Sequence, residues 1–307
     1  MRHRKAWLVL PYILIILLLT GCMKTIPFAY QTQSQNLLYR TVNHTMRNIM
    51  NSLSKLMAAA SESANKDDAA EGQKTAPRLI AHAGGDIHGV RMTNSLQALD
   101  SSYDEGFCFI EVDICLTSDG VPVLAHDWGN ANWFAGIKYS TEQPGYEEFI
   151  KRTGIMGIEF MDLNKLALWL SEHDGAYIVT DIKQDNIEVL RHIKESYPEA
   201  SKRIIPQIYS IDEYEPVRDL GYDQVILTLY KIKIIGDEIF EFCSRKPLFG
   251  LTMSQSRADS ELLEKFSALG IPIYVHTIND YNEYIKLRDK GVYGVYTDFF
   301  QPSDWVE

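Results

Sequence analysis

The sequence predicts an α/β fold, a (β/α)8 TIM barrel, preceded by a lipoprotein signal peptide and a helical N-terminal linker. From Arg78 onward, eight short apolar runs alternate with helical patterns. Strands that are apolar on both faces are typical of a parallel sheet covered by helices. Eight of them in about 230 residues match a barrel. An open doubly wound sheet is the competing fold, but no G-x-G-x-x-G loop follows the first run.

The first 22 residues have the features of an export signal. MRHRK is basic, residues 6–20 are apolar, and the sequence Leu-Thr-Gly-Cys ends at Cys22, which resembles a bacterial lipobox. The apolar stretch is short for a membrane span of about 20 residues. We expect residues 1–21 to be a signal peptide. Cys22 would then be acylated and anchor an exported lipoprotein to a membrane, at the cell surface or the periplasmic face. An uncleaved anchor and an ordinary cleaved signal are the alternatives.

Residues 22–77 are expected to form a helical and flexible linker. Apolar residues from Val42 to Ala60 step by threes and fours, which indicates one helical stripe. The stripe is shorter than the three to four heptads expected of a coiled coil, so it favours an amphipathic helix. The small and polar sequence SESANKDDAAEGQKTAP follows. The barrel domain is therefore expected at residues 78–307.

The charge of the chain is unevenly distributed. Residues 1–77 hold nine Lys and Arg against four Asp and Glu, a net charge of +5. Because the whole chain carries −11, the remainder carries −16. So acidic a domain is unsuited to nucleic acid, since contacts to phosphate groups need Lys and Arg. It is better suited to hold a cation.

Three cysteines other than Cys22 lie in the domain. Cys108 and Cys115 are on one predicted strand, roughly 23 Å apart at ~3.3 Å per residue, so they cannot form a disulfide with each other. With Cys243 they make no disulfide framework. We expect all three to be buried in the core.

The strands and helices of the barrel follow in order along the chain. The helical stretches begin with an acidic or polar residue and end at Gly or Pro, and a Thr/Asn cap is expected for the first. An insertion at about 128–160 separates a His-Asp pair from the next helix. The strands are expected at 78–83, 108–115, 176–182, 203–209, 223–230, 247–253, 271–277 and 293–299, and the helices at 93–106, 161–175, 185–198, 210–221, 259–270 and 280–291.

Polar residues lie near the carboxyl ends of the predicted strands, where barrel enzymes keep their active sites. Glu111 and Asp113 point the same way from one apolar strand, and their charges would repel each other and lose hydration. A bound cation would remove both penalties, and Asp181 on the neighbouring strand can complete the site. Oxygen ligands favour Mg²⁺ or Ca²⁺ over zinc. The alternative is a structural salt bridge between Glu111 and Lys183.

Two histidines flank this expected metal site. His82 ends the first strand, and His126 follows the extended segment after Asp113. Two histidines beside a divalent ion suit general acid–base catalysis, in which one accepts a proton and the other donates one. The ion would stabilise negative charge that develops on an oxygen. This set of residues fits phosphoryl transfer.

The motifs resemble those of the glycerophosphodiester phosphodiesterase family, within the phospholipase C-like TIM-barrel phosphodiesterases. AHAGG, TNSLQAL, GFCFIEVDICLTSDGVPVLAHD, TDIK and GVYTD occur in the family's order across the domain. The resemblance implies metal-dependent hydrolysis of a glycerophosphodiester. In such a reaction the hydroxyl beside the phosphoester attacks phosphorus, and a cyclic product is hydrolysed afterwards. It also implies a role for each site residue. His82 and His126 would be the catalytic acid and base, and Glu111, Asp113 and Asp181 the metal ligands. Lys183 would be the basic residue near the phosphate.

The sequence departs from the family pattern at several positions. The first motif is His82-Ala83-Gly84 where the family usually has His-Arg-Gly, and Thr93 stands where it usually has Glu. Arg91 or Lys183 is expected to supply the missing positive charge at the phosphate. His276 stands where the family often has Trp, and we expect it to contact a polar headgroup such as glycerol or a sugar. Gln207 is expected to contact the substrate as well.

Three functions are consistent with these residues. A phosphodiesterase acting on a lipid headgroup or a surface polymer fits a membrane-anchored chain. A non-catalytic or altered-substrate barrel lipoprotein that binds such a headgroup or polymer is the alternative raised by the missing Arg. An enolising lyase would have its carboxylates spread one per strand, so the Glu111–Asp113 pair speaks against it.

Overall fold

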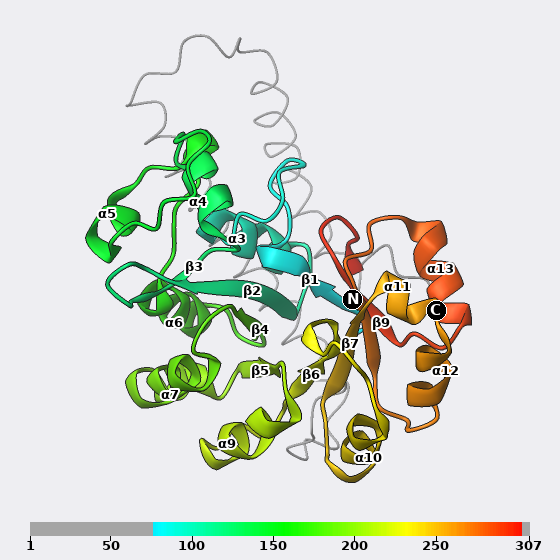
Figure 1. Ribbon diagram of the computed structural model, residues 1–307. Coiled ribbons are helices and arrows are strands. Elements are labelled where there is room, and N and C mark those ends of the chain that lie inside the picture. Colours follow the sequence, from blue (N-terminus) through cyan, green and yellow to red (C-terminus); the bar gives the residue numbers. More distant parts are fainter. Residues whose placement is uncertain (1–75, 303–307) are drawn as a thin grey trace, which may run out of the picture. The chain divides into compact units, whose positions relative to one another are not determined.

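The computed structural model describes residues 76–302, which contain a closed barrel of eight parallel strands (Figure 1). The closure is made by β1, which pairs with β2 through Ala81 and Ile110 and with β9 through Ile80 and Tyr296. The predicted TIM barrel is therefore confirmed, and the open doubly wound sheet is wrong. The strands are β1 (Leu79–Ala81), β2 (Phe109–Leu116), β4 (Tyr177–Ile182), β5 (Ile204–Ile208), β6 (Ile226–Thr228), β7 (Gly250–Ser254), β8 (Ile273–His276) and β9 (Gly294–Thr297).

The two faces of β2 show how the strands direct the site residues. Ile110, Val112 and Ile114 belong to the large apolar core that also contains residues of the surrounding helices. Phe109 belongs instead to a second cluster, which includes residues of seven barrel strands and fills the barrel interior. Side chains alternate along a strand, so Glu111 and Asp113 point into the barrel with Phe109. Because they come later in the strand, they lie nearer its carboxyl end.

The helices cover the outside of the barrel. Six match predicted stretches: α3 (Leu96–Asp104), α6 (Leu163–Glu172), α7 (Asn186–Ser196), α9 (Tyr214–Asp219), α12 (Glu261–Ser267) and α13 (Tyr281–Asp289). Three others were not predicted: α8 (Pro198–Ser201), α10 (Asp237–Arg245) and α11 (Gln255–Ala258). Short 3₁₀ turns are η2 (His82–Gly84), η3 (Ile155–Gly157), η4 (Ile211–Glu213) and η5 (Leu229–Lys231).

The cap of α3 differs from the expectation. Ser95 is the N-cap residue, and its hydroxyl accepts a hydrogen bond from Ala98 N at 3.3 Å. Thr93 and Asn94 lie before the helix, and Asn94 has a left-handed backbone with φ of 48°. The predicted Thr/Asn cap is therefore wrong by one residue, because the Asn94 side chain is engaged by Asp113 instead.

A short strand that was not predicted, β3 (Pro122–Leu124), pairs antiparallel with β2. It pairs Leu124 with Ile114, and Ala125 N donates a hydrogen bond to Asp113 O at 3.0 Å. The hairpin formed by β2 and β3 thus brings the chain back to the level of Asp113. It brings His126 beside Asp113, although His126 follows no strand of the barrel itself.

The insertion after His126 shares a small apolar core with the β2–β3 hairpin, to which Cys115 and Val123 contribute. It contains α4 (Trp128–Phe134), α5 (Tyr146–Lys151) and η3. Phe134, Phe149 and Phe160 pack together there with Ala131 and Ile158. The insertion is therefore a packed structure and not an extended loop.

Cys115 and Cys243 are buried as expected, but Cys108 is exposed, and all three are free thiols. Cys108 precedes β2 at the amino-terminal end of the barrel, so the expectation of three buried cysteines is wrong for this residue.

Among residues 76–302, no helix is long and apolar enough to cross a membrane. The signal peptide, Cys22 and the predicted linker helix lie outside the described residues.

Candidate active site

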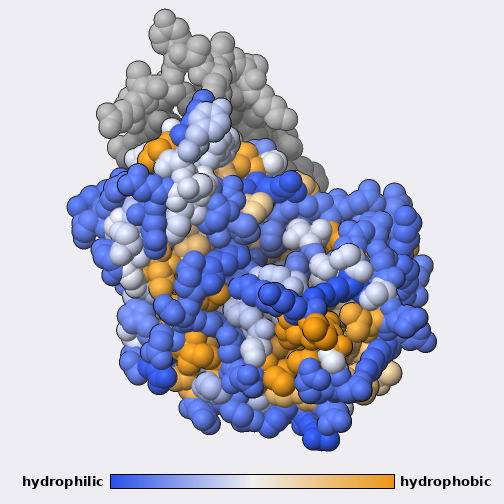
Figure 2. Space-filling model, in the orientation of Figure 1, coloured by the Kyte–Doolittle hydropathy of each residue, from blue (hydrophilic) through white to orange (hydrophobic). Residues whose placement is uncertain are grey.

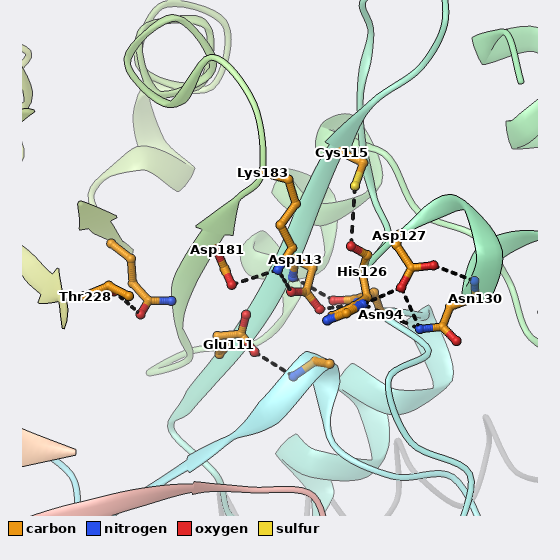
Figure 3. Close-up of polar contacts among 12 residues, drawn as sticks. Asn94, Glu111, Asp113, Cys115, His126, Asp127, Asn130, Asp181, Lys183 and Thr228 are labelled. Carbon is orange, nitrogen blue, oxygen red and sulfur yellow. Dashed lines mark hydrogen bonds and ion pairs between the residues drawn. The ribbon is translucent and has the colours of Figure 1, made fainter. Parts of the chain in front are cut away.

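Three carboxylates come together at the carboxyl ends of the strands (Figure 3). Glu111 and Asp113 share one face of β2, and the register of the parallel pair places Asp113 directly beside Asp181 of β4. One oxygen from each carboxylate lies within 4.8 Å of the others. Their residues are 2%, 1% and 9% exposed. The structure therefore brings together the three predicted metal ligands.

Lys183 lies between two of these carboxylates. Its Nζ is 2.6 Å from Asp113 Oδ1 and 2.8 Å from Asp181 Oδ2. Burial alone would lower the pKa of Lys183, but the charges of Asp113 and Asp181 outweigh burial and raise it. The salt bridge that was the alternative for Lys183 thus exists, but with Asp113 and Asp181 and not with Glu111.

Glu111 remains without a cation in direct contact among the described residues. Its Oε2 accepts a hydrogen bond from Ala83 N at 2.7 Å. Burial, and then the charge of Asp113, raise the pKa of Glu111 above its ordinary value. One ammonium faces three carboxyl groups, so the cluster carries an excess of buried negative charge when all three are ionised. This excess, together with a donor set made only of oxygen atoms, fits a divalent cation such as Mg²⁺ or Ca²⁺.

Two tyrosines hold Asp181 in place. The hydroxyl of Tyr209, directly after β5, donates to Asp181 Oδ1, and the hydroxyl of Tyr230 lies 3.3 Å from Oδ2. Burial would raise the pKa of Asp181, but Lys183 and the Tyr209 hydrogen bond lower it. The sequence placed Tyr209 at this end of the barrel without giving it a role. Tyr230 was not predicted as a site residue.

Asn94 fixes the orientation of Asp113. Its Nδ2 donates to Asp113 Oδ2 at 2.9 Å, and its Oδ1 accepts from Asp113 N at 2.8 Å. Both residues are buried. The TNS motif before α3 was the available signal, but it was interpreted only as a helix cap. Asn94 is therefore a site residue that reasoning from the sequence missed.

His82 is held by a carboxylate from the last strand. Its Nδ1 is 2.8 Å from Oδ1 of Asp298, and Asn279 Nδ2 donates to Oδ2 of the same carboxylate at 2.7 Å. Burial lowers the pKa of His82, but the hydrogen bond to Asp298 and the charges of Glu111 and Asp113 outweigh burial and raise it to about 9. His82 is therefore protonated at neutral pH.

His126 is paired with the residue that follows it. Its Nδ1 is 2.6 Å from Asp127 Oδ2, which also accepts a hydrogen bond from Asn130 Nδ2 at 3.0 Å. Asp127 Oδ1 accepts from Asn130 N and caps α4. Figure 3 shows His126 and Asp127 together beside Asp113. Each of the two predicted catalytic histidines thus has its own carboxylate.

The other predicted substrate contacts have different positions. Arg91 is half-exposed, and its Nη1 is 3.4 Å from Asp298 Oδ2, so it contacts the partner of His82 and not the three carboxylates. Gln207 is buried, and its Oε1 accepts a hydrogen bond from Thr228 Oγ1 at 2.8 Å inside the barrel. His276 ends β8, and its ring lies edge-on to Tyr230 with centroids 5.1 Å apart.

The Nε2 atom of His276 is buried and has no hydrogen-bond partner in the part of the chain that the structure describes. Such an atom is costly unless a water or ligand satisfies it. Burial, and then the charge of His82, lower the pKa of His276 to about 4; the charge of Asp181 opposes this shift, and that of Lys183 adds to it. The imidazole is therefore neutral at physiological pH and is able to exchange a hydrogen bond with a hydroxyl.

The neutral state of His276 makes the protein acid-sensitive. Between pH 6.5 and about 4, His276 binds a proton in the unfolded chain but not in the folded protein. The free energy of unfolding should therefore fall as pH drops through this window, by up to about 3 kcal/mol. Urea denaturation at pH 7 and pH 4.5 checks this, and His276→Gln should lose less stability than the parent chain. Equal losses in both would contradict it, and exposed His88→Gln is the control.

One segment of the chain matches a known protein family. Residues 83–134 match the model of the glycerophosphoryl diester phosphodiesterase family. The matched segment contains Glu111, Asp113 and His126. The family resemblance that the sequence motifs indicate is therefore confirmed.

Solved structures of such proteins share the barrel. A glycerophosphodiester phosphodiesterase from Thermotoga maritima has a TM-score of 0.56 at 21% identity, covering 74% of this chain and 96% of the other. One from Parabacteroides distasonis has a TM-score of 0.56 at 20% identity, covering 74% and 94%. A phosphodiesterase from Oleispira antarctica, in complex with its product sn-glycerol-3-phosphate, has a TM-score of 0.60 at 19% identity, covering 72% and 93%. At these identities the likeness shows a common fold.

Proposed function

We propose, from the confirmed family resemblance and the geometry of the site, that this chain is a metal-dependent hydrolase of glycerophosphodiester-type phosphodiesters. The observation that carries the proposal is one group of side chains at the carboxyl end of the barrel. It contains the three-carboxylate cluster and two histidines, each paired with its own carboxylate. A phosphoryl group needs positive charge and two proton-transfer groups, and this arrangement can supply both.

Glu111, Asp113 and Asp181 would hold the cation, which is Ca²⁺ or Mg²⁺ by the chemistry of its ligands. When bound, the cation would stabilise negative charge on a phosphoryl oxygen. Asn94 keeps Asp113 oriented, and Tyr209 does the same for Asp181. Lys183, on the same carboxylates, is the cationic side chain that would face the phosphate.

The two histidines have distinct proton-transfer roles in this proposal. His82 is protonated at neutral pH, so it would donate a proton from its ring to the leaving alcohol oxygen. His126, oriented by Asp127, would accept the proton of the substrate hydroxyl that attacks phosphorus. Hydrolysis of the cyclic product would reverse the two roles, with water as the nucleophile.

Two residues would define the alcohol part of the substrate. The unsatisfied Nε2 of His276 suits a hydroxyl of glycerol or a sugar. Arg91 contacts Asp298 and is exposed, so it would contribute positive charge at the edge of the site and adjust the His82–Asp298 pair.

We also propose that Cys22 anchors the chain, so that the domain meets lipid headgroups or surface polymers at an extracytoplasmic membrane face.

The test is turnover of a panel of glycerophosphodiesters by the purified chain, with Ca²⁺, with Mg²⁺ and with chelator. Metal-dependent release of the alcohol would establish the activity and identify the headgroup. Tight, saturable metal binding without turnover would favour the non-catalytic binding lipoprotein. Absence of metal binding would refute the role of Glu111, Asp113 and Asp181.

The His82–Asp298 pair predicts a particular pH profile. His82 must be protonated to donate, so turnover should be lost as pH rises through its pKa. Asp298→Asn removes the carboxylate whose hydrogen bond contributes most to raising that pKa, so the alkaline limb should move to lower pH. The value of kcat at neutral pH should fall by about 10- to 100-fold. A profile of kcat/KM against pH checks this, with the exposed Asp289→Asn as control. An unshifted alkaline limb would show that Asp298 has only a structural role.

A further inference from the structure

Four large apolar side chains are exposed on the insertion after His126. They are Trp133 at 48% exposure, Ile137 at 41%, Tyr139 at 104% and Met156 at 63%. The first three lie on one loop that begins in α4, and Met156 is in η3. The two loops are neighbours, because a Cβ added at Gly136 would lie 3.8 Å from Ile155 Cγ2. We call these four residues the apolar lip.

The lip is not a consequence of a loosely packed insertion. The same insertion buries Phe134, Phe149 and Phe160 in the small apolar core that it shares with β2 and β3. Tyr139 and Met156 both have a left-handed backbone with φ of 59°, where a non-glycine residue costs about 1–2 kcal/mol. A packed scaffold therefore holds these apolar side chains outward, at a cost in backbone energy. Clustered exposed apolar residues of this kind mark an interaction surface.

One short helix joins the lip to the candidate active site. Asp127 pairs with His126 and also caps α4, whose last turn carries Trp133. Seven helical residues span about 10 Å at 1.5 Å per residue. Figure 1 shows α4 and α5 together at one edge of the barrel, and Figure 2 shows hydrophobic and weakly polar residues over α4. A partner that contacts the lip would thus lie beside the mouth of the site.

We propose that the apolar lip inserts into the interfacial region of a phospholipid bilayer and places the active-site mouth against it. Trp and Tyr favour the headgroup level of a bilayer, and Ile137 and Met156 suit the acyl boundary beneath it. The basic and acidic residues of the insertion nearly balance, because residues 128–160 hold three Lys and Arg against four Glu, so the attraction is apolar and suits zwitterionic lipid.

The length of chain before the barrel supports this partner. The inference rests on the proposed anchoring at Cys22 and not on the proposed hydrolysis. Residues 23–77 cannot extend beyond about 200 Å at 3.3–3.6 Å per residue, whatever their conformation. An anchored domain therefore stays close to one membrane, and at that high local concentration a small apolar surface is sufficient for contact.

Fluorescence quenching by brominated lipid tests the proposal. The full chain is incorporated into phosphatidylcholine vesicles with and without brominated acyl chains. Emission from Trp133 is taken as the difference between the parent chain and Trp133→Phe. We expect loss of the Trp133 emission in brominated vesicles, at low and at high salt. Tyr139→Asp and Met156→Asp should restore it, because a charge in the lip opposes insertion.

The control variant is Ile234→Asp, which places the same charge at an exposed apolar residue outside the lip. It should leave the quenching unchanged. Trp133 emission that is equal in both kinds of vesicle, while the chain floats with them, would overturn the proposal and leave a protein or polymer as the partner of the lip. Turnover of a soluble glycerophosphodiester is measured separately in detergent, so failure of the proposed activity would not be confused with failure of this inference.

Discussion

Glu111→Gln is expected to abolish metal-dependent turnover and, at the same time, to stabilise the metal-free protein. Glu111 is buried beside Asp113 and has no cation in contact among the described residues, so its pKa is raised to about 8. Until a metal binds, the folded protein keeps this carboxyl protonated at neutral pH, at a cost in stability. Gln has nearly the same shape, and its carbonyl oxygen can still accept the hydrogen bond from Ala83 N. Because Gln needs no such proton, the substitution should raise the free energy of unfolding at neutral pH by about 1–3 kcal/mol.

Two measurements separate these opposite effects. Thermal unfolding with chelator should show a higher Tm for Glu111→Gln than for the parent chain. Added Ca²⁺ or Mg²⁺ should raise the Tm of the parent chain but not that of the variant, because a ligand stabilises only the state that binds it. Exposed Glu195→Gln is the matched control. A lower Tm with chelator, or an intact response to metal, would show that Glu111 is a structural residue.

His82→Gln and His126→Gln are each expected to lower kcat by about 10²–10⁴-fold while leaving metal binding intact. Among residues 76–302, neither histidine forms a hydrogen bond or ion pair with the three carboxylates that would hold the cation, and each is held by a separate carboxylate, Asp298 or Asp127. The rise in Tm that metal produces should therefore persist in both variants. Exposed His88→Gln should retain full activity.

The double variant gives a sharper test of the two histidines. If one histidine donates and the other accepts a proton in the same step, their effects are not additive, and the double variant should be little worse than the poorer single variant. Multiplicative losses would indicate that the two residues act in different steps. A normal kcat in either single variant would refute its catalytic role.

Several features of the site follow from local sequence alone. The two-residue period of a strand places Glu111 and Asp113 on one face, and the alternation of apolar runs with helical patterns predicts parallel strands and a barrel. The same logic places His82, Asp181 and Lys183 at one end, because all parallel strands finish on the same side. These conclusions depend on the two-residue period of the strands and on the order of strands and helices along the chain. Both can be read directly from the sequence.

The tertiary structure decided which of these groups contact each other. His82 and Asp298 are 216 positions apart and meet only because β1 and β9 pair to close the barrel. Asn94 appeared to be a helix cap, but folding brings it against Asp113, 19 positions away.

The ion pairs of Lys183 and the buried position of Nε2 in His276 both result from contacts between different strands. The register between β2 and β4 sets Asp113 beside Asp181, and Lys183 bridges this pair instead of binding Glu111. His276 was recognisable as a strand-end residue, but its burial depends on Tyr230 from another strand end. By itself the sequence determined the fold, the end of the barrel that carries the site and the residue types there. Only barrel closure and strand register, which are long-range packing properties, decided the partners and therefore the charge of each group.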